Sequence, residues 1–220
     1  MHNTTLLERL DEAIARRHLL KHPFYQAWTE GKLDRECLQL YAAQYYRHVE
    51  AFPQHLRALA ARTQGDLRSL VEENLAEEEH PAMPHPRLWR DFAAGIGVDE
   101  KAVREAAPLP GVQALVDTFD GIARDGSVAE AVAAFYAYEA QVPEIATQKI
   151  DGLRKFYGVT DAKSLAYFRV HEEADVRHRA AWREWLAQQN EAGADRIVAT
   201  TEKALESLWG ALDAVYAPRN

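Results

Sequence analysis

Hydrophobic positions recur at intervals of three and four residues along most of the chain, which is the period of an amphipathic helix. No stretch shows the strict alternation that is typical of a strand. A short segment after the first helix, "HPFYQAWTEG", closes at Gly31, and residues 99–110 read as a short helix and a loop. The longer helices are predicted over about residues 5–18 with Asn3 or Thr4 as cap, 34–62, 66–79, 87–97, 111–124, 127–149 and 162–188, with a last one ending near 216.

Local signals refine these elements. Pro53 predicts a kink in the second long helix, and the proline-rich run "HPAMPHP" predicts a break after residue 79. Ser127 and Glu130 have the spacing of a capping box. The pattern therefore predicts an all-α fold, a single domain over residues 1–220 built as a bundle of about seven or more helices.

Composition narrows the class of protein. A chain of 220 residues, 47% hydrophobic and 27% charged, fits one soluble globular domain. The net charge of −8, with no concentrated basic run, argues against a nucleic-acid partner. There is no apolar run of membrane-spanning length and no basic-then-apolar leader, so we expect no membrane partner and a cytoplasmic protein.

The single cysteine, Cys37, excludes an internal disulfide and thiolate metal sites as a class. We interpret it as a small packed residue. Any transition metal must be held by nitrogen and oxygen ligands, for which the chain offers nine histidines. Three of these, His22, His48 and His55, are interpreted as surface or core residues.

The segment "HEEADVRH" carries the first candidate chemistry. His171, Asp175 and His178 stand at positions i, i+4 and i+7, which places them within an arc of roughly 60° on one helix face. Such a face is either a charged outer surface or a set of metal ligands. Glu139 lies in an apolar run that predicts burial, where an unpaired carboxylate needs a cation or donors to offset its cost.

Two metal sites are compatible with these residues. A ferritin-type site would use the Glu-x-x-His pair Glu77 and His80 together with Asp175 and His178, leaving His171 unused. The rival set joins three carboxylates and three imidazoles, which suits two metals and oxygen chemistry. Its members are Glu78, His85, Glu139, His171, Asp175 and His178.

Several blocks of the chain resemble a known family. They are "HPFYQAW", "LQLYAAQYYRHVEAFP", "NLAEEE" with "HPRLW", "YAYEAQVPEIATQK" and "AYFRVHEEADVRH". The chain resembles the haem-oxygenase-like di-metal oxidases, most closely the group of the chlamydial protein associating with death domains. The resemblance implies the second ligand set, two metal ions (Fe/Fe or Mn/Fe), O2 as co-substrate, an external reductant from an unidentified electron donor, and a homodimer.

The same resemblance implies a function. These proteins make p-aminobenzoate for folate biosynthesis from their own tyrosine side chain, in a single turnover, with a lysine as amino donor. The matching positions are Tyr25 and Lys149. We expect Tyr41, Tyr138 and Tyr167 to line the same cavity, where they could relay electrons or position intermediates. By residue type alone, Tyr25 would be a packed core tyrosine and Lys149 a cation at a helix C-terminus.

Other functions remain open at this point. The metal site could oxidise a free amino acid or fatty acid, or it could be structural in an interaction protein. A cofactor-free oxidase, like the relatives that form pyrroloquinoline quinone, would leave the candidate ligands without a role. The thiaminases that resemble this fold depend on a cysteine nucleophile, whereas the single cysteine here lies early in the chain.

Overall fold

The computed structural model describes residues 5–189 and 193–216, and every regular element within these ranges is helical. The predicted all-α class is confirmed, and the described ranges contain no strand. In chain order the elements are α1 (Leu6–Arg16), the 3₁₀ turn η1 (Leu19–Lys21), α2 (Pro23–Thr29), α3 (Arg35–Ala60), α4 (Gly65–Glu78), α5 (His85–Gly95), α6 (Glu100–Glu105), α7 (Pro110–Asp125), α8 (Val128–Glu139), α9 (Val142–Phe156), α10 (Ala162–Ala187) and α11 (Ala194–Tyr216).

The first helix begins one residue later than the pattern predicts. Thr5 is its N-cap, and a capping box joins the Thr5 amide to the Glu8 carboxylate over 2.8 Å. The predicted caps Asn3 and Thr4 lie outside the described residues. The segment predicted only as a short connection forms α2, which His22 caps through its ring nitrogen. Gly31, with φ of 68°, closes it in the left-handed region.

The helix predicted over residues 127–149 is two helices. The capping box of Ser127 and Glu130 is present, with the Ser127 amide 2.7 Å from the Glu130 carboxylate. However, α8 ends at Glu139, because Pro143 in the first turn of α9 has no amide to donate to the Glu139 carbonyl. The side chain of Gln141 bridges the break by donating to the Ala137 carbonyl over 2.7 Å.

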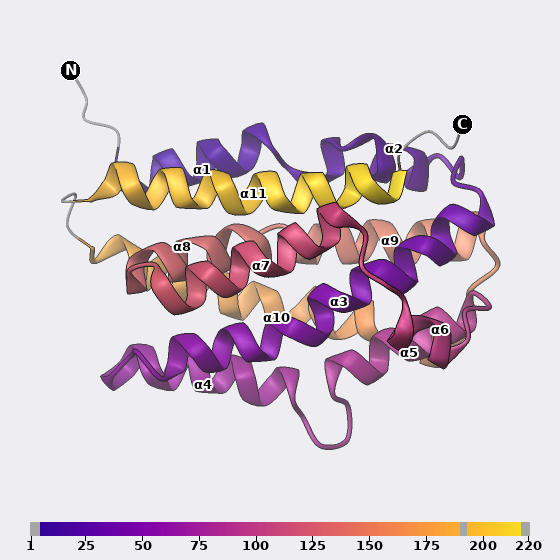
Figure 1. The fold of residues 1–220 in the computed structure, drawn as a ribbon, viewed down its shortest axis with the longest axis horizontal. Coiled ribbons are helices and arrows are strands. Elements are labelled where there is room, and N and C mark those ends of the chain that lie inside the picture. Colours follow the sequence, from indigo (N-terminus) through magenta and orange to yellow (C-terminus); the bar gives the residue numbers. More distant parts are fainter. Residues whose placement is uncertain (1–4, 190–192, 217–220) are drawn as a thin grey trace.

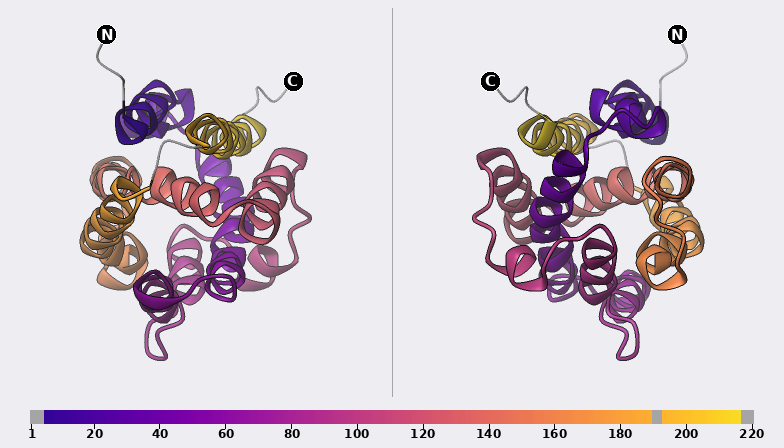
Figure 2. Two further views of the ribbon diagram at one scale, coloured as in Figure 1. Left: turned by 90° about the vertical axis from the view of Figure 1, so that its left-hand side faces the viewer. Right: turned by 90° about the vertical axis from the view of Figure 1, so that its right-hand side faces the viewer.

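The helices pack lengthwise around a common axis (Figures 1 and 2). In Figure 1, α1 lies along α11 at the top, and α3 lies along α4 at the bottom. Helix α10 contacts α5, α8 and α9, and α3 contacts α4, α5 and α7. The loop between α4 and α5 stands out from the body of the molecule in both figures.

The buried apolar side chains form one cluster that reaches most of these helices. Helix α8 is buried on all sides from Glu130 to Glu139, as its apolar run predicts. It therefore carries its last two residues, Tyr138 and Glu139, into the interior. No helix among the described residues is both long and apolar enough to cross a membrane.

Candidate metal centre and tyrosine cavity

All six candidate metal ligands are buried, and the structure gathers them into two triads. Within each triad, one nitrogen or oxygen atom from every side chain lies within 4.8 Å of the others. We call them the first triad, Glu78, His85 and His171, and the second triad, Glu139, Asp175 and His178. The ferritin-type set is not assembled, because Glu77 and His80 belong to neither triad among the described residues.

Helix α10 supplies one ligand to the first triad and two to the second. The side chains of His171, Asp175 and His178 are all buried on the face that their spacing predicts. His171 lies one turn before Asp175, so the same face of α10 contributes first to one triad and then, one turn later, to the other. This register brings the two triads side by side along one helix.

The remaining candidate ligands stand at helix ends. Glu78 is the last residue of α4 and His85 the first of α5, and the proline-containing loop turns the chain between them. As a result, Nδ1 of His85 lies 2.8 Å from Oε2 of Glu78. Glu139 is the last residue of α8. Helix C-termini disfavour negative charge, so both carboxylates lie where a cation is favoured.

Several buried polar atoms of the triads lack hydrogen-bond partners. They are Nδ1 of His85, Oδ2 of Asp175 and both ring nitrogens of His178. Each unpartnered buried group costs about 1–3 kcal/mol, and native interiors hold few of them. His85 and Glu78 are close without hydrogen-bond geometry, as expected of two side chains that share a third partner. Imidazole and carboxylate donors without thiolate fit iron or manganese.

His171 is prepared to bind through one nitrogen. Its Nδ1 lies 2.6 Å from the backbone carbonyl oxygen of Tyr167. Because a carbonyl only accepts, Nδ1 donates and carries the proton, which leaves the Nε2 lone pair free. The arrangement of a backbone carbonyl behind an imidazole is typical of metal-binding histidines.

The two triads differ in electrostatics. In the second triad, burial and the neighbouring Asp175 raise the pKa of Glu139 far above its ordinary value. Burial would lower the pKa of His178, but Asp175 and Glu139 outweigh it and raise the pKa. In the first triad, burial would raise the pKa of Glu78, but the neighbouring His85 outweighs it and lowers the pKa. The second triad therefore favours protonation, and a bound cation would take the place of the protons.

Two further residues hold the Glu139 carboxylate. Asn74 donates to Oε1 over 2.8 Å, and the indole of Trp182 donates to Oε2 over 2.6 Å. The sequence pattern did not single them out, although each stands one helical turn from a candidate ligand. Asn74 precedes Glu78 by four residues and Trp182 follows His178 by four, a spacing that places both on the ligand-bearing faces.

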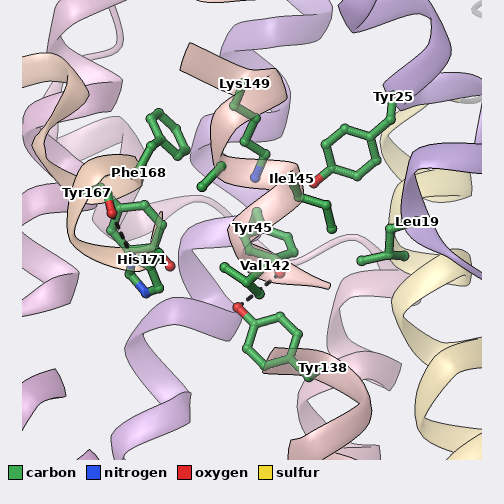
Figure 3. A pocket seen from close by; sticks show the side chains of 11 residues that line it. Leu19, Tyr25, Tyr45, Tyr138, Val142, Ile145, Lys149, Tyr167, Phe168 and His171 are labelled. Carbon is green, nitrogen blue, oxygen red and sulfur yellow. Dashed lines mark hydrogen bonds between the residues drawn. The ribbon is translucent and has the colours of Figure 1, made fainter. Parts of the chain in front are cut away.

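A small cavity of about 20 Å³ lies beside the first triad. Tyr25, Lys149 and His171 all line it, as do Tyr138 and Tyr167 (Figure 3). In Figure 3 the Tyr25 hydroxyl and the Lys149 amine point toward one another, and His171 lies on the other side of the amine. A cavity of this size holds about one water-sized molecule.

Lys149 is a buried amine in an aromatic cage. Its Nζ donates to the Tyr41 hydroxyl over 2.7 Å and lies 5.4 Å from the centre of the Tyr25 ring. The rings of Trp89 and Phe168 are at 5.6 and 5.3 Å. Burial lowers the pKa of Lys149 to about 7. A large fraction of the amine is therefore neutral and nucleophilic near neutral pH.

The tyrosines near the cavity contact one another in a row, and not all of them line the cavity. Tyr41 does not line the cavity but lies behind it, with its hydroxyl 3.3 Å from that of Tyr25. Tyr41 stacks on Tyr45, and the Tyr45 hydroxyl donates to that of Tyr138 over 3.4 Å. Tyr45 was not predicted, although it follows Tyr41 by one turn of α3. Tyr167 packs against the His171 ring at 4.3 Å between centres.

The histidines set aside in the sequence lie outside both triads. His48 and His55 are buried in the aromatic core around Phe119, and His22 caps α2. Cys37 is buried, as expected of a packed residue. None of these side chains contributes to the candidate centre among the described residues.

A helical bundle with a buried set of imidazole and carboxylate donors fits the class of metal-binding proteins. The sequence signature described as "iron-containing redox enzyme" matches residues 39–209, and the chain belongs to this family. Its fold is the haem-oxygenase-like one. A domain of unknown function with that fold from Shewanella denitrificans superposes with a TM-score of 0.80, at 20% identity, covering 96% of this chain and 90% of that one.

The chain is also similar to particular enzymes within this group. It is 42% identical to the 4-aminobenzoate synthase of Nitrosomonas europaea, over 98% of this chain and 93% of the relative. It is 37% identical to the 4-aminobenzoate synthase of Chlamydia trachomatis, over 96% of this chain and 92% of the relative. The family resemblance found in the sequence is thereby confirmed.

Proposed function

We propose that this protein forms p-aminobenzoate by consuming its own Tyr25, with Lys149 as the source of the amino nitrogen. Similarity to 4-aminobenzoate synthases over nearly the whole chain supports the product. The proposal that the substrate is part of the chain rests on the cavity, where the phenol, the amine and a candidate ligand meet.

The two triads would hold two transition-metal ions. When bound, these ions supply activation of O2 and the acceptance and transfer of electrons. The first triad has two imidazoles and one carboxylate, a donor set that suits Fe(II). The second has one imidazole and two carboxylates, which suits manganese as well as iron. The ligand division thus supports either an Fe/Fe or a Mn/Fe pair.

Conversion of Tyr25 into p-aminobenzoate changes three positions. The Cα–Cβ bond breaks, which leaves residue 25 as glycine, and Cβ is oxidised to a carboxylate. A C–N bond replaces the phenolic C–O bond, whose oxygen leaves as water. Lys149 supplies the electron pair of the new bond. Its own Nζ–Cε bond then breaks by oxidation of Cε and hydrolysis, which leaves an aldehyde at residue 149. O2 is the oxidant, and an external reductant supplies the electrons that the side chains do not.

Residues around the amine prepare it for this role. Burial keeps a large fraction of Lys149 neutral, so that its lone pair is available. The Tyr41 hydroxyl accepts a hydrogen bond from Nζ of Lys149 and also contacts the Tyr25 hydroxyl. It therefore lies between the amine that would give the amino group and the phenol that would receive it. A proton can therefore pass from the amine side to the phenol side through Tyr41.

One observation carries the proposal: Tyr25, Lys149 and His171 line a single cavity of about 20 Å³. That volume suits a diatomic or water-sized molecule, whereas a free amino acid or fatty acid needs far more space. The aromatic substrate is then part of the wall, and O2 is the molecule that has to fit.

Mass spectrometry of the whole protein tests this directly. Metal-loaded protein is mixed with reductant and O2, and the chain should become lighter at residue 25 by a tyrosyl fragment as p-aminobenzoate appears. Tyr25→Phe should form no product. Tyr46→Phe is the matched control, because its hydroxyl bonds Glu50 and Arg90 outside the cavity. Product from Tyr25→Phe, or an unchanged mass after turnover, would refute self-consumption.

A further inference from the structure

The six candidate ligands are buried, so a metal ion must reach them through the protein. A surface pocket of about 210 Å³ opens between the end of α4, the α4–α5 loop and the outer face of α10. His85 of the first triad lines it, although only 5% of this residue is exposed. His85 is therefore a buried candidate ligand at the edge of an open pocket.

Glu77 connects the same pocket to the second triad. It lines the pocket, and its Oε2 lies 3.4 Å from Nε2 of His178. The other ring nitrogen of His178 faces inward, 3.5 Å from Asp175 and 3.9 Å from Glu139. Glu77 thus stands between solvent and the second triad, while His85 stands between solvent and the first.

Arg177 covers the Glu77 carboxylate from the solvent side. Its two terminal nitrogens lie 3.1 and 3.2 Å from the two carboxylate oxygens. The Arg177 side chain is 60% exposed, and an ion pair at such an exposed position contributes little to stability. Arg177 can therefore swing into water at little cost and release the carboxylate.

We propose that this pocket is the route by which divalent metal ions reach the centre, with Glu77 as the first ligand and Arg177 as its removable counter-ion. The end of α4 adds the negative potential of a helix C-terminus at the same point. The cavity beside Tyr25 also reaches His171, but its walls are mostly aromatic and aliphatic. They contain the Lys149 amine and no carboxylate that could receive a cation. The inference rests on the proposed metal centre.

The glutamate that would receive the ion was noticed in the sequence for another reason. Glu77 and His80 form a Glu-x-x-His pair, the motif of ferritin-type sites. Both line the pocket and neither joins a triad. The His80 ring is turned toward its own loop, where Nδ1 accepts from the Ala82 amide over 3.3 Å. Glu77 is therefore the residue of the pair to test.

Uptake of Co(II) by the metal-free protein tests the route without any turnover. Anaerobic apo-protein is mixed with Co(II) at low ionic strength, and the visible absorption of the bound ion is followed in time. Metal analysis after gel filtration then gives the final content. Three variants are compared with the parent protein: Glu77→Gln, Arg177→Gln and Glu79→Gln. Glu79 is the matched control, because it is paired with Arg57 and does not line the pocket.

The two pocket variants should move the uptake rate in opposite directions. Glu77→Gln should slow it about tenfold by removing the receiving charge, and Arg177→Gln should accelerate it about threefold by uncovering that charge. Glu79→Gln should match the parent, and all four proteins should reach the same final content. Added salt should narrow the differences.

The outcomes separate the route from the centre. Equal rates in all four proteins, with a full final content, would overturn the route and leave the proposed metal centre standing. A lower final content in Glu77→Gln at an unchanged rate would also overturn it, because Glu77 would then hold the bound ion or position His178. A parent protein that takes up no Co(II) would overturn both proposals.

Discussion

Around the two triads, three carboxylates and three imidazoles lie buried with several of their polar atoms unpartnered. In the cavity that His171 also lines, Lys149 lies equally buried, among aromatic rings and with a hydroxyl as its hydrogen-bond partner. Burial disfavours the charged form of the buried groups in both regions. That charge is negative on the carboxylates of the triads and positive on the Lys149 amine. In the second triad Glu139 holds a proton more tightly or binds a metal ion, whereas in the cavity the amine gives up its proton. The difference shows how one helical core can hold a cation and a neutral amine side by side.

The largest expected effect comes from replacing the amine. Lys149→Met should lower p-aminobenzoate formation at least about a hundredfold, because no other amine lines the cavity among the described residues. It should also stabilise the fold by about 1–3 kcal/mol, since an apolar chain of similar length replaces a buried polar group. Chromatographic assay of the product and chemical denaturation measure the two effects.

Lys155→Met is the control, because Lys155 is an exposed lysine on the same helix. It should change neither the product yield nor the stability. Metal content should equal that of the parent in both variants. Lys149→Met with normal product would show that the nitrogen comes from elsewhere. The neutral amine would then have no role in the reaction, and the proposed difference in function between the cavity and the triads would be wrong.

A second prediction concerns stability against pH in the metal-free protein. Glu139 and His178 have raised pKa values in the folded state, so the native protein binds more protons than the unfolded chain. Their contribution to stability is complete at low pH and is lost as pH rises from about 4.5 toward about 9. We expect a loss of about 2–4 kcal/mol across this window in urea denaturation.

Metal binding should remove most of that slope, because the ion replaces the shared protons. Lys149 contributes the opposite sign. Its pKa is lowered to about 7, so the unfolded chain binds the extra proton between about 7 and 10.5, and stability rises with pH there. Lys149→Met should therefore steepen the loss seen in the metal-free protein. An apo-protein whose stability is independent of pH would contradict both assignments.

The residues show what the sequence could predict and what it could not. The helical class follows from local periodicity, and the three positions on α10 share a face because their spacing is set within one helix. The break after Glu139 was missed because the apolar run continues through it, although Pro143 has no amide to continue the helix. The pairing of Glu78 with His85 depends on how a proline-containing loop turns, and no periodic pattern records that.

The supporting residues were missed for a different reason. Asn74, Trp182 and Tyr45 are ordinary by residue type, and only their distance of four positions from a site residue distinguishes them. Extending each candidate site residue, ligand or tyrosine, by one helical turn would have found all three. The pocket at Glu77 could not be predicted, because it requires α4 and α10 to be placed in space.

A smaller effect is expected on the rate at different pH values. If the neutral Lys149 amine forms the C–N bond, product formation should rise with pH and level off above a pKa of about 7. The rate at about pH 6 should then be about tenfold lower than at about pH 8. Single-turnover assays on fully loaded protein measure this, with metal content checked at each pH. A rate that falls over the same range would mean that the protonated amine is required.

The smallest effect tests whether the row of tyrosines matters beyond packing. Tyr45 and Tyr46 are neighbours on α3, but only Tyr45 lines the cavity, where its hydroxyl donates to Tyr138. Tyr45→Phe keeps the ring that stacks on Tyr41 and removes one hydrogen bond, so we expect product formation to slow about threefold. Tyr46→Phe removes a hydroxyl outside the cavity and should leave the rate unchanged. Equal rates in the two variants would assign Tyr45 to the packing of the cavity wall. A loss far beyond threefold would instead make its hydroxyl part of the path by which protons or electrons reach Tyr138.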